Sequence, residues 1–553
     1  MPALVSITAL LMLVLPWPLL LTGLVLGSAA NRHVGLIKKV TRISAGFALS
    51  TAVLATATDL WGWNASKTVL SFPLPWHLGA FAFNVDVNTL SIIMMLLVAL
   101  VGFVVVRYAS TYMEGDAHEG AFHRWLALTV GAFLVVITAG NVWEFFLFWV
   151  ATSLLLHNLL AFYRDRPLAL IAARKKYILH RISDLCLFIA LILIVHTLNT
   201  SQFNHIMPAV SKISGPLPQS LEIASALLVV AAVLKSAQVP FHGWLIQVME
   251  APTPVSALLH AGIIYTGTFL LLRMVAILSR AFWAQDLLII VGLFSIATAS
   301  LMMMTATNIK GSLAYSTTAQ MGFMLMEIGL GLYPLAVLHI ISHSVYKAHA
   351  FLSSGSTVEY FRWPSLPHAT SVLSLGKMAA SWVLATVIVM FTGWILDVPF
   401  SHNLPITVMA VILGVALSQL IYSATSPEPM HVPWVLGISV AMSGLIATLY
   451  FLLGSWFMTL FHFPEMALAR GAGQEILLGL TVAIFFSLLL IQQMLPKLLT
   501  RPLFQALFVH LYNDLYIDMV FTRWIQRFSP GKKAAASPAL FEEDQQLEEV
   551  RSL

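Results

Sequence analysis

Long apolar stretches recur along the whole of this 553-residue sequence, and they constrain the fold more than any other feature. Charged residues make up 10% of the chain and hydrophobic residues 59%, whereas about 25% of the residues of an ordinary soluble domain are charged. A helix that crosses a bilayer needs about 20 apolar residues. We therefore predict an all-α polytopic membrane protein with about 13–15 transmembrane helices.

The basic residues between these stretches predict which side of the membrane each loop faces. They follow the first stretch and then occupy alternate loops, at Arg32, Lys38, Lys39, Arg42, Arg164, Arg166, Arg174, Lys175, Lys176, Arg362, Lys497 and Arg501. Because cytoplasmic loops carry an excess of Lys and Arg, we expect the N-terminus outside and the C-terminus in the cytoplasm. The formal net charge of +5 reflects this bias, and nothing in the sequence indicates binding to nucleic acid.

A lysine lies deep inside one of the most apolar stretches. Lys235 is about two helical turns inside its apolar run, and Pro240 follows five residues later. A charged amine in a bilayer costs several kcal/mol and indicates a functional site unless it snorkels to the interface. Pro240 removes a backbone hydrogen bond, and a broken helix beside a buried charge is typical of transport sites. We predict that Lys235 belongs to a proton or ion path.

Three polar residues share one face of the sixth predicted span, residues 174–197. Arg181 and Asp184 are three residues apart, and His180 and Asp184 are four apart, so their side chains lie on the same side of a helix. The carboxylate suits a role as the partner of a buried lysine. An internal ion pair that only holds helices together is the alternative, and the spacing does not choose between the two.

Further groups that can carry protons follow along the chain. Pro252 and Pro254 disrupt or start the next helix, and His260 enters it about two turns later. The proton affinity of a histidine suits a relay near neutral pH, although a hydrogen-bonded core histidine is the alternative.

A later span carries a ladder of such groups. His339, His343 and Lys347 repeat every four residues, which aligns them over about 12 Å of one helix stripe. This spacing suits stepwise proton transfer. Two histidines so spaced could also bind a metal, but no carboxylate or thiol accompanies them. Lys310 opens the preceding span, where it could also serve as an interfacial anchor.

These residues lie in segments that resemble a known family. The segments are Lys235-Ser-Ala-Gln-Val-Pro240, Ala251-Pro-Thr-Pro-Val-Ser-Ala-Leu-Leu-His260, Ile309-Lys-Gly-Ser-Leu-Ala-Tyr-Ser-Thr317 and His339-Ile-Ile-Ser-His-Ser-Val-Tyr-Lys347. They resemble the antiporter-like subunits of respiratory complex I and of Mrp cation/proton antiporters. The resemblance implies two inverted five-helix repeats, each with a broken helix and a buried lysine. It places Lys235 and His260 in the first repeat, and Lys310, His339, His343 and Lys347 on a central polar axis.

The sequence also departs from the pattern of this family. In the fifth predicted span, residues 142–163, Val150 follows Trp149 where the family has a glutamate that pairs with the lysine. Glu144 lies upstream and, like Asp184, is a candidate for that role. In the twelfth span, Asp397 occupies the place of the second broken-helix lysine. With these departures, the chain most resembles the DabB membrane subunits of bacterial inorganic carbon transporters. A basic loop at 163–167 and a tail at 506–518 support this resemblance.

The resemblance implies a two-subunit machine in the bacterial inner membrane. The membrane subunit would conduct protons, or sodium, while a DabA-like cytoplasmic zinc subunit resembling β-carbonic anhydrase converts CO2 to bicarbonate in one direction. This chain would then be a transporter subunit without enzymatic residues or cofactors of its own. The alternatives are an antiporter-like subunit of complex I or of an Mrp antiporter, and a membrane anchor that does not conduct. Direct passage of bicarbonate is less favoured, because no half-helix site for an anion is evident.

The domain organisation follows from the spans and the resemblance. We predict N-terminal helices over 1–110, a first repeat over 111–276, a second over 277–424, C-terminal helices over 425–496, and a cytoplasmic tail over 497–553. The tail begins with apolar residues at helical spacing, namely Phe504, Leu507, Phe508, Leu511 and Leu515. This pattern predicts an amphipathic helix on a surface or a short helix packed on the bundle, followed by an acidic segment.

Overall fold

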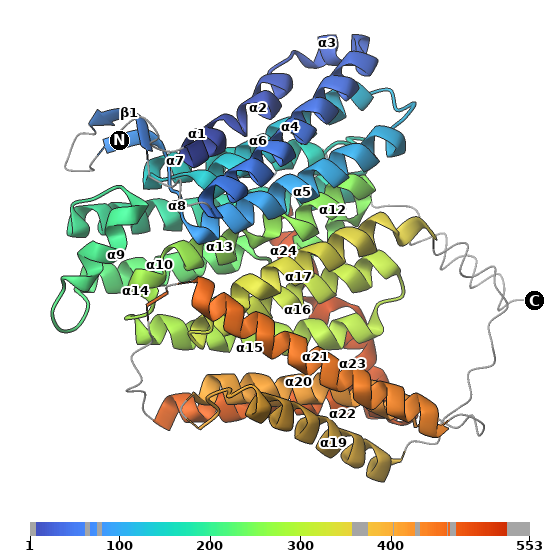
Figure 1. Ribbon diagram of the computed structural model, residues 1–553. Helices are drawn as coiled ribbons and strands as arrows, with labels where there is room; N and C mark the ends of the chain where they lie inside the picture. Colours follow the sequence, from blue (N-terminus) through green and yellow to red (C-terminus); the bar gives the residue numbers. More distant parts are fainter. Residues whose placement is uncertain are drawn as a thin grey trace, which may run out of the picture.

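Helices account for nearly all of the regular structure in the computed structural model, as the sequence predicts (Figure 1). The structure describes residues 7–60, 67–73, 80–356, 374–401, 403–425, 432–461, 463–464 and 472–527. Within these residues, eleven helices are long and apolar enough to cross a membrane. Four further predicted spans are present as helices that are shorter or less apolar, at 7–23, 219–235, 309–329 and 333–352.

The first apolar stretch folds as two short helices that pack on a long one. The N-terminal helices are α1 (Ile7–Val14), α2 (Trp17–Gly23), α3 (Gly27–Arg32) and α4 (Val34–Leu60). Pro16 lies between α1 and α2, and its missing N–H interrupts the helical hydrogen bonds there. Buried hydroxyl pairs join these helices to α4, Thr8 to Thr58 at 2.8 Å and Thr22 to Ser44 at 3.1 Å.

A β-hairpin follows α4, as a small addition to a fold that is otherwise helical, as predicted. Strands β1 (Lys67–Pro73) and β2 (Ala80–Val85) pair antiparallel, with Lys67 opposite Val85 and Pro73 opposite Ala80. A bridge between Val85 and Ala139 ties the hairpin to the helix bundle. We call this side of the bundle the hairpin end. Its strands of seven and six residues are much shorter than the about 20 apolar residues that a membrane-spanning helix needs, so the sequence predicts no span here.

Four long helices form the centre of the N-terminal half. They are α5 (Thr89–Tyr112), α6 (Glu119–Thr138), α7 (Val142–Leu160) and α8 (Pro167–Leu198), followed by the short α9 (Phe203–Ser211). The side chains of Asn88 and Asn141 cap α5 and α7 by accepting from backbone N–H groups at 2.8 and 2.9 Å. Such caps satisfy donors that a helix start leaves free. Both caps lie at the hairpin end, beside the tight connection between α6 and α7.

The next two spans are both broken. The first consists of α10 (Gln219–Lys235), a non-helical link at 236–242, α11 (Gly243–Gln247) and the 3-10 turn η1 (Val248–Glu250). The second consists of α12 (Thr253–Ala261), η2 (Ile263–Tyr265), α13 (Thr266–Arg273) and α14 (Val275–Leu278). Pro252 and Pro254 start α12, and the break lies instead at Gly262, two residues after His260.

Three unbroken helices pack beside these broken ones. They are α15 (Phe282–Thr305), α16 (Ile309–Gly329) and α17 (Tyr333–Leu352), with the turn η3 (Ser354–Ser356) after them. Glycines allow α15 and α16 to approach closely, because a Cβ on Gly292 would lie 2.5 Å from the carbonyl oxygen of Gly322. This close contact holds α16 against α15, and α16 forms one wall of the central polar axis.

The C-terminal helices form a separate layer against α15 and α17 (Figure 1). They are α19 (Leu375–Ile395), α20 (Leu404–Ser423), α21 (Val432–Leu460) and α22 (Ala472–Leu498). The helix α19 runs without a break, so the broken helix expected in the second repeat is not found there. Asp397 lies two residues past its end with a φ of 52° and an exposed side chain, not inside a span.

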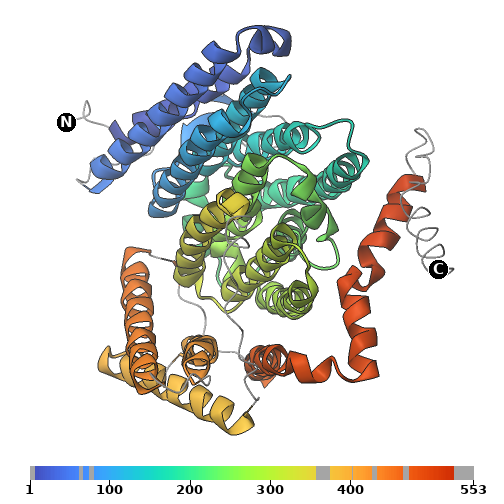
Figure 2. The same ribbon diagram turned by 90° about the vertical axis from the view of Figure 1, so that its right-hand side faces the viewer.

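The chain then turns back along the side of the bundle (Figure 2). This C-terminal arm, residues 502–527, consists of α23 (Pro502–Tyr512), η4 (Asp514–Tyr516) and α24 (Ile517–Arg527). Leu511 is buried in a small cluster with Ile246 and Tyr315. The first tail helix thus contacts the bundle through Leu511, while Leu507 and Leu515 stay exposed, so both alternatives for the tail remain predictions. The acidic segment after 527 lies outside the described residues.

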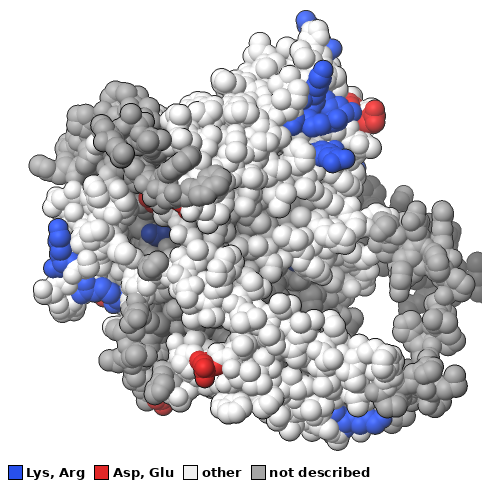
Figure 3. Space-filling model, viewed as in Figure 1, with Lys and Arg blue, Asp and Glu red and all other residues white. Residues whose placement is uncertain are grey.

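Charged side chains mark the two edges of the bundle. In Figure 3, Lys and Arg gather toward two sides of the view, and most of the surface between them is uncharged. A band of this kind suits a protein surrounded by lipid, because charges at membrane depth are costly. The predicted membrane orientation and the five domain boundaries stay predictions.

Candidate functional site

Lys235 is the last residue of α10, and the chain leaves the helix immediately after it. The following link contains Ala237 with a φ of 49° and ends at His242, before α11 begins. The side chain of Lys235 is 4% exposed. Its amine lies 3.4 Å from Oδ1 of Asp184 and 4.2 Å from the centre of the Trp149 ring. The predicted broken helix and buried lysine are thus present together.

Asp184 is the carboxylate that pairs with this lysine. It also accepts a hydrogen bond from Nε1 of Trp149 at 2.8 Å and forms an ion pair with Arg181 at 2.7 Å. Both Arg181 and Asp184 come from α8, at the spacing that the sequence indicates. Three donors thus converge on the Asp184 carboxylate. It keeps Trp149 and Arg181 as partners whether Lys235 is protonated or neutral.

Glu144, the other predicted partner of the lysine, lies in a different place. It is buried near the start of α7, where it accepts from the backbone N–H of Asn84 at 3.2 Å. Beside it, at the hairpin end, Arg273 pairs with Asp86 at 3.1 Å. The structure therefore assigns the role of lysine partner to Asp184 and leaves Glu144 in a second buried polar cluster.

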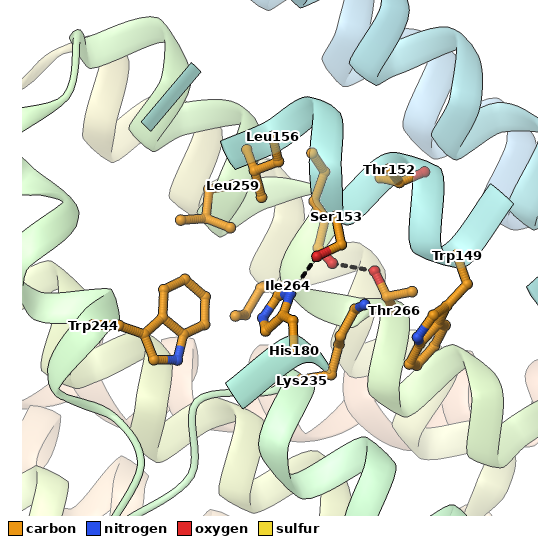
Figure 4. Close-up of a pocket in the computed structure, with 11 residues that line it drawn as sticks. Trp149, Thr152, Ser153, Leu156, His180, Lys235, Trp244, Leu259, Ile264 and Thr266 are labelled. Carbon is orange, nitrogen blue, oxygen red and sulfur yellow. Dashed lines mark hydrogen bonds between the residues drawn. The ribbon is translucent and has the colours of Figure 1, made fainter. Parts of the chain in front are cut away.

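A small cavity of about 10 Å³ adjoins Lys235 (Figure 4). Its polar wall includes Ser153 and His180, whose Oγ and Nδ1 atoms lie 2.9 Å apart, and Trp244 closes the opposite side. A space of this size holds about one water molecule. The cavity therefore has Lys235, Ser153 and His180 in its lining, with room for one water molecule.

Lys176 extends this polar cluster along α8. Its amine donates to the backbone carbonyl of Ser153 and lies 3.3 Å from the Ser153 hydroxyl. The sequence reading counted Lys176 among the basic loop residues, but the side chain is fully buried. Its role can be recognised in the sequence from the four-residue spacing of Lys176, His180 and Asp184. This spacing places all three side chains on one stripe of a helix.

A second polar cluster surrounds His260. Its Nδ1 atom lies 2.9 Å from the Thr317 hydroxyl, and its ring stacks on Phe351 with centroids 4.3 Å apart. The Tyr265 hydroxyl donates to the carbonyl oxygen of His260 at 3.1 Å and is hydrogen-bonded to Nδ1 of His343 at 2.7 Å. Tyr265 was not singled out by the sequence, because an isolated tyrosine in an apolar run carries no pattern.

The ladder on α17 is present at the predicted spacing. His339 lies within hydrogen-bonding distance of Glu327 at 3.0 Å and of Gln320 at 2.8 Å. The rings of His339 and His343 have centroids 6.2 Å apart. Lys347 is fully buried and donates to the carbonyl oxygen of Leu313 at 2.8 Å. Each rung is thus held by a partner from a neighbouring helix.

One end of this ladder opens into a large cavity. The cavity measures about 670 Å³ and lies between the α15–α17 wall and the C-terminal helices. Most of its lining is apolar, but it also includes the polar side chains of His339, Glu327, Gln320, Gln419 and Gln492. Polar groups of this kind are the partners that a water molecule in a cavity needs. Among the described residues, no group of three or more His, Cys, Asp or Glu is placed to hold a metal ion.

Two predicted residues lie apart from both clusters. Lys310 is partly exposed at the start of α16 and donates to the Thr253 hydroxyl at 3.0 Å, which suits the anchoring alternative. Asp397 is exposed beyond α19. The structure thus brings Lys235, Asp184 and Arg181 into one cluster, and His260, His343 and His339 into another.

Two family models match the chain, and one of them covers both clusters. The model for the transmembrane part of the NADH:quinone oxidoreductase/Mrp antiporter family matches residues 139–426, and the model for the N-terminus of complex I chain 5 matches residues 77–123. The first match is slightly more than half of the chain and includes both polar clusters.

Curated relatives and solved structures agree with these matches. The chain is 38% identical, over 80% of each sequence, to the probable inorganic carbon transporter subunit DabB2 of Halothiobacillus neapolitanus. It is 41% identical to the probable inorganic carbon transporter subunit DabB of Hydrogenovibrio crunogenus, over 60% of this chain and 64% of that protein.

The fold is also found in solved structures of membrane complexes. One is the Mrp complex from Dietzia, with a TM-score of 0.60 and 20% identity over 97% of this chain and 62% of that one. Another is the archaeal membrane-bound sulfane sulfur reductase, with a TM-score of 0.56 and 16% identity over 93% of this chain and 99% of that one. The chain is therefore a multi-pass bacterial membrane protein of the NADH:quinone oxidoreductase/Mrp antiporter family, in the branch of the DabB inorganic carbon transporter subunits.

Proposed function

We propose that this chain conducts protons, or sodium ions, for an inorganic carbon uptake complex. The ion gradient would drive CO2 hydration to bicarbonate in one direction at a cytoplasmic zinc subunit of the DabA type, resembling β-carbonic anhydrase. The observation that carries the proposal is the buried pair of Lys235 and Asp184 at the break of α10. The names of the DabB relatives supply the substrate, inorganic carbon.

The geometry of the pair suits a reversible change of charge. When Lys235 releases its proton, the neutral amine can stay over the Trp149 ring while Asp184 remains paired with Arg181. When Lys235 is protonated, Asp184 serves both cations. Burial disfavours the charged amine and the carboxylate favours it, so the two effects oppose each other at the same atom.

The membrane potential supplies enough energy for such coupling. One elementary charge that crosses 100 mV releases about 2.3 kcal/mol, which corresponds to about a fifty-fold change in a reaction ratio. If each CO2 hydration is linked to the passage of one ion, the gradient is large enough to make hydration effectively one-way. The link would pass through the broken helix, because that helix carries Lys235 and continues to the loop ahead of α12.

The first experiment identifies the partner. We would purify the tagged protein gently from its native host, identify the co-purifying proteins by mass spectrometry, and measure the zinc content. A single large zinc-bearing cytoplasmic subunit is expected. Respiratory or Mrp subunits in its place would contradict the proposal and favour the antiporter-like alternative.

The second experiment tests conduction. Lys235→Ala should preserve assembly with the partner but abolish gradient-dependent bicarbonate accumulation in cells, whereas Lys377→Ala, an exposed lysine on α19, should not change it. If Lys235→Ala accumulated bicarbonate as the wild type does, the chain would be a membrane anchor for its partner and not an ion path.

A further inference from the structure

The C-terminal arm covers the broken helix through a carboxylate that is far from it in sequence. Asp518 accepts from the amine of Lys175 at 2.7 Å and from Nε2 of Gln247 at 2.7 Å. The contact with the start of α11 is so close that a Cβ on Gly243 would lie 1.8 Å from an oxygen of Asp518. Lys175 is fully buried under the arm. The arm is therefore fitted to this position by charge and by shape.

A second carboxylate of the arm faces a buried histidine. Oδ1 of Asp514 lies 3.8 Å from Nε2 of His242, and it accepts a hydrogen bond from the Tyr315 hydroxyl. The His242 ring is fully buried, yet neither ring nitrogen has a hydrogen-bond partner among the described residues. Buried polar groups without partners are rare and call for an explanation.

The position of His242 supplies that explanation. It lies in the non-helical link of the broken span, seven residues after Lys235 and immediately before α11. The groups that face it are Asp514 from the arm and Tyr315 from α16, while Lys175 pairs with Asp518 one turn farther along the arm. The Asp514 side chain is 18% exposed, so its carboxylate lies between the buried His242 ring and the surroundings of the bundle.

The backbone of the arm holds Asp514 in an unusual conformation. Three consecutive residues, Asp514, Leu515 and Tyr516, have φ values of 55°, 51° and 62°. Residues other than glycine adopt this left-handed region at a cost of about 1–3 kcal/mol each, and such strain gathers at functional segments. The contacts of Asp514 and Asp518 offset this cost, so the strained turn sets the carboxylate opposite His242.

From these contacts we infer that His242 and Asp514 form a proton-transfer pair on the side of the broken helix away from the hairpin. This inference rests on the proposed function. A proton passes from a nitrogen of protonated His242 to the Asp514 carboxylate, which leaves a neutral imidazole and a carboxylic acid. The acid releases the proton to water, and the imidazole accepts the next one from the Lys235 side. The 3.8 Å gap closes by a small shift or through one bridging water. Lys175 and Asp518 are positioning residues that hold the arm.

The test measures proton flux through the purified complex in sealed vesicles under an imposed potential, with a pH-sensitive dye inside. We expect Asp514→Asn, which can still accept from Tyr315, to lower the flux at least tenfold while the complex stays assembled. His242→Gln should do the same, the double variant should be no slower than either single variant, and Asp514→Glu should restore much of the flux. Asp397→Asn serves as the matched control.

The outcomes separate this inference from the proposed function. Flux within twofold of the wild type in Asp514→Asn or His242→Gln would overturn the inference, provided Lys235→Ala abolishes it in the same vesicles. If Lys235→Ala also conducts, the proposed function itself is wrong. If Asp514→Asn fails to assemble, His242→Gln and Asp514→Glu decide the question. Wild-type flux in His242→Gln, or no flux in an assembled Asp514→Glu complex, would then show that Asp514 has a structural role only.

Discussion

The two polar clusters are built differently, although both are buried between helices. The cluster around Lys235 concentrates charge, with two cations and one carboxylate within hydrogen-bonding or ion-pair distance and a cavity of about 10 Å³ beside them. In the cluster along α17, hydrogen bonds join His260, Tyr265 and His343, and His339, whose ring centroid lies 6.2 Å from that of His343, lines a cavity of about 670 Å³. One arrangement suits storage of a charge, and the other suits delivery of protons from water.

This difference predicts different responses to mutation. Removing one member of a buried charged group leaves an uncompensated charge, which costs about 3–5 kcal/mol. Removing one neutral hydrogen bond costs about 0.5–1.5 kcal/mol. The Lys235 cluster should therefore lose both stability and conduction, whereas the cluster along α17 should lose conduction with a smaller effect on stability.

The largest effect is expected for Asp184→Asn. The amide can still accept from Trp149, but Lys235 and Arg181 lose their counter-ion, so we expect a loss of about 3–5 kcal/mol in stability and no measurable proton flux. Thermal unfolding in detergent and vesicle flux check the two parts. Asp86→Asn is the matched control, since it breaks the buried pair with Arg273 and should lower stability while retaining most of the flux per assembled complex.

A smaller effect is expected for His343→Gln. Glutamine preserves a hydrogen bond to Tyr265 but cannot carry a proton, so flux should fall about tenfold while stability changes by no more than about 1.5 kcal/mol. A loss of stability as large as that of Asp184→Asn would remove the distinction between the two clusters.

Tyr265→Phe should act more weakly still. It removes the hydroxyl that joins the His260 carbonyl to His343, and a loss of about 1 kcal/mol in stability with a several-fold lower flux is expected. Flux and unfolding temperature can be measured on the same preparation. Unchanged flux would show that protons reach His343 without passing this tyrosine.

Asp397→Asn should have the smallest effect. The side chain is exposed beyond the end of α19 and belongs to neither cluster, so flux within twofold of the wild type is expected in the vesicle assay. A large loss would show that the second repeat contains a conducting group at this position, as the family resemblance first suggested.

The sequence predicts the parts of the site that depend on local pattern. Lys235 in an apolar run, Arg181 and Asp184 at helical spacing, and the ladder from His339 to Lys347 all follow from periodicity and the cost of buried charge. The choice of Asp184 over Glu144 does not follow, because it depends on which helix faces α10. The hairpin and the docking of Asp518 on Lys175 were missed for a related reason, since neither is encoded within a single apolar segment.

The central claim is that Lys235 carries the transported charge, and proton flux through the assembled complex in sealed vesicles tests it most directly. Wild-type complex and Lys235→Ala would be compared at equal protein content, under the same imposed potential, with assembly confirmed by co-purification of the partner. The account predicts potential-driven flux in the wild type and none above the empty-vesicle background in Lys235→Ala. Equal flux in the two preparations would contradict it.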